Sequence, residues 1–161
     1  MNFRQHVLRW LILISMFSLF ASDGLIAQIN PWQKMADMPE GKTTSVGVIN
    51  GKIYIMGVGS TSKLFFEYDP KTNEYKSLAD MPSSRSSIPA GAAANGHFYT
   101  FGGNAASGQP PLEKVYAYEP TSDSWKEVAD MPNSRYLLRV CACGGKIYTG
   151  GAYYVPKAME I

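Results

Sequence analysis

One eight-residue phrase occurs three times in this chain of 161 residues. It begins with an aromatic residue and ends in Ala-Asp-Met-Pro, and its copies start at Trp32, Tyr75 and Trp125. The starts lie 43 and then 50 residues apart. Self-similarity at such a period is typical of folds that repeat one supersecondary unit. The repeat therefore constrains the fold more than any other feature of the sequence.

Two further motifs define the repeating unit. Segments 51–57, 96–102 and 145–151 each open with a turn glycine and continue with alternating apolar and aromatic residues, which is the pattern of a strand. Segments 67–75 and 117–125 each contain a tyrosine at their second position, followed by an acidic-Pro turn, and end at an aromatic residue. Each unit thus predicts four short antiparallel strands, and the chain is predicted to be all-β.

The strands are predicted at similar places in both units. In the first unit they are Thr44–Ile49, Lys52–Met56, Lys63–Tyr68 and Glu74–Ala79. In the second unit they are Ala90–Ala94, His97–Phe101, Lys114–Tyr118 and Ser124–Val128. No segment after the N-terminal region shows an extended helical periodicity.

Linked in this order, the motifs resemble kelch repeats of a β-propeller, from Trp32 to Ala152. The resemblance implies an outer strand over 32–38, blades over 43–81 and 85–131, and a partial blade over 135–161. The first repeat departs from the pattern, because Gly57-Val58-Gly59 replaces the glycine doublet and Tyr75 replaces the usual Trp. The repeat positions to which we assign a structural role are Trp32, Tyr68, Tyr75, Gly102, Gly103, Tyr118, Trp125, Gly150 and Gly151.

Packing explains why these residues recur. Aromatic side chains on neighbouring strands are expected to fill the layer between adjacent blades. The repeated carboxylates Asp37, Asp80 and Asp130 precede a Met-Pro pair that ends each fourth strand. A single catalytic site would not need three equivalent copies, so we assign these aspartates to structure.

The N-terminus carries a targeting signal. Arg4 and Arg9 precede an apolar run over 10–21, and small residues follow it. This order is typical of a secretory signal peptide. The run is shorter than the roughly 20 residues of a membrane span. We predict cleavage after Ala27, no stable membrane span in the mature chain 28–161, and export to the periplasm or the extracellular space.

Charge and cysteines exclude several kinds of partner. The net charge is +2, and no basic stripe indicates nucleic acid or an anionic membrane. Cys141 and Cys143 lie two apart on a predicted strand, at the edge of disulfide reach. We expect buried free thiols and no metal site.

Enzyme chemistry finds few candidates. His97 is the only histidine after the signal region, and Lys52 and Lys146 hold the same repeat position. An exposed strand residue is the simpler interpretation of His97 than a base or ligand. One histidine cannot build the copper centre of the related galactose oxidase propeller. The sequence predicts no catalytic residue and no cofactor, and it favours a protein that is not an enzyme.

A binding face is the better-supported function. By the resemblance, the loops leading into each blade and the loops between second and third strands share one face. Cations recur there, and could attract a carboxylate. Alternatively, the arginines brace adjacent blades through main-chain carbonyls. The candidate ligand-binding residues are Lys42, Arg85, Arg135, Arg139 and Asn104.

Four functions remain open. We favour an exported module that binds a protein or a glycan through this face. The alternative is a carbohydrate-active propeller such as an epimerase of a sugar acid, for which Glu40 and Glu113 are the loop carboxylates. A purely structural array and a non-functional fragment of a longer propeller complete the set.

The number of blades bears on assembly. Propellers ordinarily close with four to eight blades, whereas this sequence predicts two complete and two partial ones. We expect a truncated product, or else head-to-tail self-association in which the strand near Trp32 completes the unit that reaches Ile161.

Overall fold

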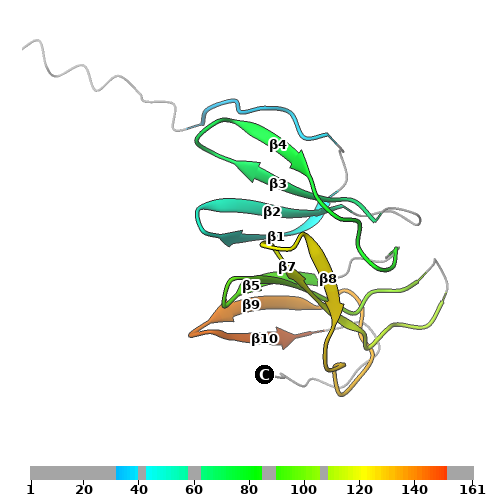
Figure 1. The fold of residues 1–161 in the computed structure, drawn as a ribbon. Helices are drawn as coiled ribbons and strands as arrows, with labels where there is room; N and C mark the ends of the chain where they lie inside the picture. Colours follow the sequence, from blue (N-terminus) through cyan, green and yellow to red (C-terminus); the bar gives the residue numbers. More distant parts are fainter. Residues whose placement is uncertain (1–31, 40–42, 58–62, 85–89, 106–108, 152–161) are drawn as a thin grey trace, which may run out of the picture. The chain divides into compact units, whose positions relative to one another are not determined.

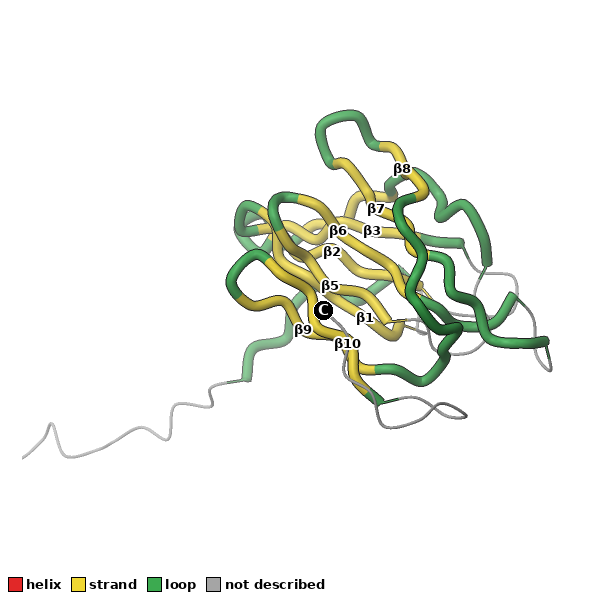
Figure 2. The backbone as a smooth tube through the Cα atoms, turned by 90° about the horizontal axis from the view of Figure 1, so that it is seen from below, coloured by secondary structure: helices red, strands yellow, loops and turns green. Residues whose placement is uncertain are grey.

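The computed structural model describes residues 32–39, 43–57, 63–84, 90–105 and 109–151. These residues form strands and loops without a helix (Figure 2). The described part of the chain accordingly has no helix long and apolar enough to cross a membrane. The strands make two four-stranded sheets and one two-stranded sheet, each antiparallel. The predicted all-β fold of four-stranded antiparallel blades is confirmed.

The first blade is a sheet in simple sequence order (Figure 1). Its strands are β1 (Thr43–Ile49), β2 (Lys52–Gly57), β3 (Phe65–Asp69) and β4 (Glu74–Ser77). Asn50 and Gly51 connect β1 to β2 with φ angles of 52° and 78°. Two successive positive φ angles are those of a type I′ turn, whose twist matches a tight hairpin.

The second blade repeats this plan. Its strands are β5 (Ala90–Ala94), β6 (His97–Phe101), β7 (Val115–Glu119) and β8 (Ser124–Glu127). Asn95 and Gly96 form its first turn, with φ angles of 50° and 80°. A third unit contributes β9 (Arg139–Cys143) and β10 (Lys146–Gly150), which pair with each other. Observed strand bounds differ from the predicted ones by no more than two residues.

The outer hairpins of the two blades share one turn chemistry. Asn73 and Asp123 adopt left-handed backbones, with φ angles of 60° and 46°. Asn and Asp tolerate this conformation better than most residues, which is why the turn sequence selects them. The acidic residue at the start of each turn caps it: Asp69 Oδ1 accepts the Lys71 N–H at 2.8 Å, and Glu119 Oε1 accepts the Thr121 N–H at 3.0 Å.

Small residues bring the innermost strands β1, β5 and β9 side by side. A Cβ built on Gly47 would lie 2.8 Å from the Cβ of Ala93, and one on Gly91 would lie 2.6 Å from the Phe98 ring. Such distances are shorter than real Cβ contacts. Ala93 belongs to the neighbouring blade, so Gly47 lets β1 and β5 approach closely, whereas Phe98 lies in the same sheet as Gly91. The close approach of β1 and β5 brings the two blades side by side.

Aromatic rings fill the layer between the first two blades, as the repeat predicts. Phe65 of the first blade is buried with only 1% exposure. Its ring centroid lies 5.0 Å from that of Phe98, 4.8 Å from that of Tyr118 and 4.9 Å from that of Trp125. These tilted and edge-to-face arrangements are the ones that aromatic pairs prefer.

Hydrogen bonds also join the first two blades beside this aromatic layer. The Ala79 N–H donates to Asp123 Oδ1 at 2.8 Å, and Trp125 Nε1–H donates to the Ala79 carbonyl at 2.9 Å. The Tyr118 hydroxyl donates to the same Asp123 oxygen at 2.6 Å. We call these four residues the junction clamp. It satisfies both main-chain groups of Ala79 with side chains from the next blade.

The predicted outer strand over 32–38 is wrong, because none of these residues belongs to a strand. Residues 35–39 instead run past β4 as irregular chain (Figure 1). The Ala36 N–H donates to Asn73 Oδ1 at 2.8 Å, and the Tyr68 hydroxyl donates to the same atom at 2.9 Å. Ala36 belongs to the first Ala-Asp-Met-Pro phrase and Ala79 to the second, so this side-chain contact takes the place of strand pairing.

The expectation of buried thiols is also wrong. Cys141 and Cys143 are both exposed, and neither forms a disulfide. They lie on β9, which pairs with β10 on one side and approaches β5 on the other. No described residue covers the face of β9 that carries the two cysteines, so they stay in contact with solvent.

Candidate functional site

Three loop segments meet beyond the end of the second blade. Asn104 forms an isolated bridge with Pro111, and Leu112 forms another with Arg135. Hydrogen bonds support the pairing, with the Arg135 N–H donating to the Leu112 carbonyl at 3.1 Å and the Gly103 N–H donating to the Arg135 carbonyl at 2.9 Å. We call Gly103, Asn104, Pro111, Leu112 and Arg135 the loop ladder.

The glycine doublet explains why the chain can build this ladder. Gly102 and Gly103 have φ angles of 56° and 85°, a region that L side chains rarely adopt. A Cβ on Gly102 would also lie 2.2 Å from the Arg135 carbonyl oxygen. Glycine is therefore required twice over, by conformation and by the close approach of Arg135.

Arg135 is the charged residue of the loop ladder, and it is fully buried, with 0% exposure. Its main-chain N–H and carbonyl are both used within the ladder. Asn104 lies in the same ladder with 6% exposure, and its Nδ2 donates to the Gln109 carbonyl at 2.5 Å. The structure thus brings two of the predicted site residues together and fixes Arg135 by its backbone.

The other predicted residues are placed differently. Arg139 opens β9 and is exposed, and its Nη1 lies 3.5 Å from the Leu138 carbonyl oxygen. It follows Arg135 by four residues and pairs with Gly150, at the end of β9 where the loop ladder segment arrives. Lys42 and Arg85 lie outside the described residues, as does Glu40. Glu113 is exposed and directly follows Leu112 of the ladder.

His97 has a carboxylate partner. Its Nε2 lies 2.8 Å from Glu119 Oε2, and its Nδ1 lies 3.0 Å from the Asn95 carbonyl oxygen. Lys52, at the same repeat position in the first blade, contacts Glu67 Oε1 at 2.5 Å. The repeat equivalent of Glu119 is Asp69, which Lys52 Nζ also approaches, at 3.9 Å. A nitrogen-bearing side chain beside this turn carboxylate therefore occurs in both blades, which supports the structural interpretation of His97.

Sequence reasoning missed the network around Glu67. The Tyr54 hydroxyl donates to Glu67 Oε2 at 2.7 Å while Lys52 donates to the other carboxylate oxygen. Burial raises the pKa of Glu67, but the hydrogen bonds from Lys52 and Tyr54 outweigh it, so the pKa lies below its usual value. Burial together with the bond to Glu67 raises the pKa of Tyr54. The sequence feature that could have indicated this network is Glu67, which lies two residues before Asp69, the acidic residue of the turn.

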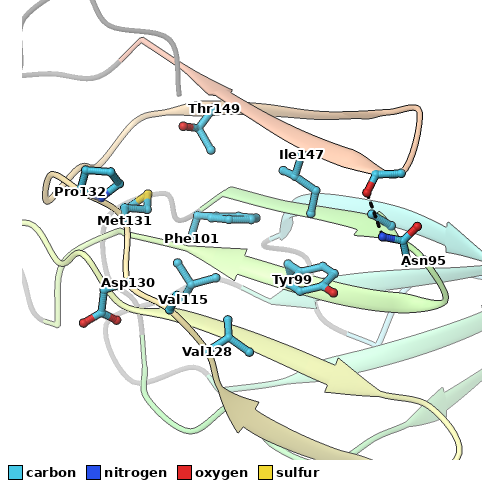
Figure 3. A pocket seen from close by; sticks show the side chains of 13 residues that line it. Asn95, Tyr99, Phe101, Val115, Val128, Asp130, Met131, Pro132, Ile147 and Thr149 are labelled. Carbon is cyan, nitrogen blue, oxygen red and sulfur yellow. Dashed lines mark hydrogen bonds between the residues drawn. The ribbon is translucent and has the colours of Figure 1, made fainter. Parts of the chain in front are cut away.

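A cavity of about 410 Å³ lies between the second blade and β10 (Figure 3). Its walls are mostly apolar, and the third Ala-Asp-Met-Pro phrase forms one side. The lining side chains that Figure 3 labels are Asn95, Tyr99, Phe101, Val115, Val128, Asp130, Met131, Pro132, Ile147 and Thr149. We call this cavity the socket. The sequence analysis did not predict it, because it arises between units rather than within one.

Metal ligation has no support in the described part of the chain. No group of three or more His, Cys, Asp or Glu side chains lies close enough to hold an ion among the described residues. The carboxylate of Asp130 is instead bound by Lys114 Nζ at 3.0 Å, and the same nitrogen contacts Glu127 at 2.6 Å.

Comparison with known proteins gives one family and one fold. The family model described as N-acetylneuraminate epimerase matches residues 35–154. Among solved structures, the one titled "Structure of YjhT" is similar with a TM-score of 0.63 and 23% sequence identity. The match covers 73% of this chain and 36% of that chain, so this sequence spans about a third of the solved protein. No curated protein matches the sequence. The fold is that of a partial kelch-like propeller.

Proposed function

Because the chain belongs to the N-acetylneuraminate epimerase family, we propose that its loop face recognises a sugar acid of the sialic acid class. The observation that carries the proposal is the loop ladder, where a buried arginine lies four residues before an exposed one. This proposal narrows the protein-or-glycan binding module expected from the sequence to an acidic glycan.

Arg135 and Arg139 have different roles in the proposed site. Arg135 is fully buried and held by two main-chain hydrogen bonds, so its role is to position the ladder. Arg139 is exposed and opens the strand that follows. A guanidinium binds a carboxylate through two parallel N–H groups, which suits the acid group of such a sugar. We assign ligand contact to Arg139 and support to Arg135.

Titration calorimetry of the full chain with N-acetylneuraminate tests the proposal, with the methyl ester of the same sugar as the uncharged control. We expect the acid to bind and the ester to bind at least tenfold more weakly. Arg139→Ala should weaken binding of the acid by about tenfold, the loss of one charge-assisted contact. Lys126→Ala, which changes an exposed cation on β8, should leave binding unchanged. Equal binding of acid and ester would refute the proposal.

Epimerisation of the same sugar is the second candidate, and the position of Glu113 favours it. The Glu113 side chain is exposed next to Leu112, while its carbonyl accepts the Met131 N–H at 2.9 Å. A carboxylate held beside a bound sugar is a suitable general acid or base. NMR of N-acetylneuraminate with the full chain would report accelerated exchange between its anomers. Glu113→Gln should abolish the exchange between anomers and keep sugar binding. If the unmodified chain binds the sugar without accelerating exchange, epimerisation is refuted and only the recognition function stands.

Export is part of the proposal and rests on the sequence of residues 1–27, which lie outside the described residues. Basic residues followed by a short apolar run direct secretion. Mass spectrometry of the protein recovered after expression in a bacterial host should find Gln28 as its first residue. A chain that keeps residues 1–27 in the soluble fraction would contradict export.

A further inference from the structure

One leucine has a backbone conformation that leucine rarely adopts. Among the described residues, five other than glycine have positive φ angles, and four of these are the Asn or Asp of a tight turn, namely Asn50, Asn73, Asn95 and Asp123. The fifth is Leu137, with a φ angle of 56°. Asn and Asp tolerate the left-handed region, whereas a bulky side chain makes it costly. Leu137 is therefore a point of backbone strain.

Fixed neighbours on both sides of Leu137 impose this conformation. Two residues earlier, Arg135 makes two main-chain hydrogen bonds within the loop ladder, at 3.1 Å and 2.9 Å. Directly after Leu137, Leu138 is buried with 1% exposure in a core cluster with Phe101. The chain has only Tyr136 and Leu137 to connect these two fixed points. A strained residue persists where the structure around it determines its conformation in this way.

The strained turn lies between the two residues proposed to act on the sugar. Glu113 directly follows the ladder residue that pairs with Arg135. Arg139 opens β9 two residues after Leu137. Because the ladder fixes the chain at Glu113 and Arg135, the course of the chain through 136–138 decides where Arg139 lies relative to Glu113.

We propose that Leu137 is a positioning residue, whose left-handed backbone holds Arg139 at a fixed place relative to Glu113, ready to bind the carboxylate of the sugar. The inference rests on the proposed function for its ligand, and on the φ angle and the fixed neighbours of Leu137 for its geometry. Backbone strain is kept where it preorganises a binding site, because a contact that is already ordered loses less conformational entropy on binding. Leu137 thus lowers the stability of the fold and increases the order of Arg139.

Replacement by glycine and by alanine separates the backbone of Leu137 from its side chain. Both Leu137→Gly and Leu137→Ala remove the leucine side chain, but only glycine adopts a positive φ angle without steric cost. We expect the glycine variant to melt about 3 °C above the alanine variant, since a left-handed alanine stays strained. The exposed strand residue Lys126 is the control, because Lys126→Gly should melt below Lys126→Ala. A glycine variant at 137 that melts below the alanine variant would overturn the proposal.

Sugar binding gives a readout that a merely structural role would not move. Titration calorimetry with N-acetylneuraminate compares the unmodified chain with the two variants. We expect Leu137→Ala to bind within about twofold of the unmodified chain, because its turn keeps one conformation. Leu137→Gly should bind roughly fivefold more weakly, because glycine populates both signs of φ and Arg139 must then be ordered on binding. The more stable variant is thus the weaker binder, and an affinity that follows stability would contradict the positioning role.

The order of Arg139 is measured without ligand, so that failure of the sugar proposal is recognised separately. NMR relaxation of the Arg139 amide gives its order parameter, which should fall in Leu137→Gly and stay unchanged in Leu137→Ala. Absence of sugar binding by the unmodified chain would refute the proposed function, and the order parameter then decides whether Leu137 positions Arg139. An order parameter that is the same in all three proteins would overturn the inference, whether or not the sugar binds.

Discussion

Trp125 donates its indole N–H to the main-chain carbonyl of Ala79, 2.9 Å away and 46 positions earlier in the chain. The two residues belong to different blades, and each comes from a copy of the same eight-residue phrase. The phrase therefore packs against its own next copy. An aromatic start in one blade meets the Ala-Asp-Met-Pro end of the blade before it.

Removal of the Trp125 side chain should cost about 3 kcal/mol of unfolding free energy, the scale of aromatic-to-alanine changes in cores. Trp125→Phe keeps most of the ring packing and loses the hydrogen bond to Ala79, so it should cost about 1 kcal/mol. Urea unfolding followed by circular dichroism gives both values. Lys126→Ala, on the exposed face of the same strand, should stay within about 0.5 kcal/mol. Equal losses at 125 and 126 would show that the inward face is assigned wrongly.

Asp123 makes the second blade sensitive to acid. The bond from the Ala79 N–H, together with that from the Tyr118 hydroxyl, holds the pKa of Asp123 below its usual value. A carboxylate with a lowered pKa stabilises the fold above its unfolded pKa of about 3.9 and loses that contribution as the pH falls through its folded pKa. Asp123→Asn should therefore reduce the acid dependence of the unfolding free energy below about pH 4.

The chain offers the control for this variant. Asn73 holds the same place in the first blade and accepts the same two kinds of hydrogen bond. Asparagine thus fits the left-handed turn, so Asp123→Asn should fold. Identical acid unfolding curves for the two proteins would contradict a stabilising role for the Asp123 carboxylate.

Substitution of Gly102 and of Gly144 by alanine distinguishes the cost of backbone strain from the cost of a steric clash. Gly102 and Gly144 have φ angles of 56° and 57°, but only at Gly102 would an added Cβ meet a close neighbour, the Arg135 carbonyl oxygen at 2.2 Å. Gly144→Ala should cost about 1 kcal/mol through its left-handed backbone alone. Gly102→Ala should cost clearly more, because the loop ladder must move. Similar melting temperatures for the two variants would show that the ladder yields easily at Arg135.

Lys52 should control the titration of Glu67. The pKa of Glu67 lies below its usual value despite partial burial, because Lys52 and Tyr54 donate to its two oxygens. Lys52→Met keeps the aliphatic stem and removes the charge, so the pKa of Glu67 should rise. Carboxyl NMR of the labelled glutamates measures the change. Lys71→Met, at an exposed turn position, should leave the pKa of Glu67 where it is.

Local features of the fold were predictable because the residues that determine them lie within one repeat unit. Alternating residues between glycines marked β2 and β6, and the acidic-Pro turns ending in Asn73 and Asp123 marked the outer hairpins. These signals act within a few residues of the chain, so no knowledge of the neighbouring blade was needed. The irregular course of 32–38 was not predicted, because later copies of the same phrase form β4 and β8 through pairing with β3 and β7, and such pairing does not depend on the phrase alone.

The candidate site followed the same division. Arginines at the ends of blades were visible in the sequence, but burial separated them: Arg135 became a support of the loop ladder and Arg139 stayed exposed. Sequence spacing gives no measure of burial. The exposed cysteines of β9 show this again, because alternation placed Cys141 and Cys143 on one face without stating what covers that face.

The sequence by itself determined the repeating unit, its strands and its turns, because these depend on alternation, on glycine and on short-range capping that lie within one copy. Only the tertiary structure decided the clamp between Ala79 and Trp125, the loop ladder around Arg135 and the socket between the second blade and β10. Each of these joins residues from different units, and their contacts exist only after the innermost strands have brought those units together.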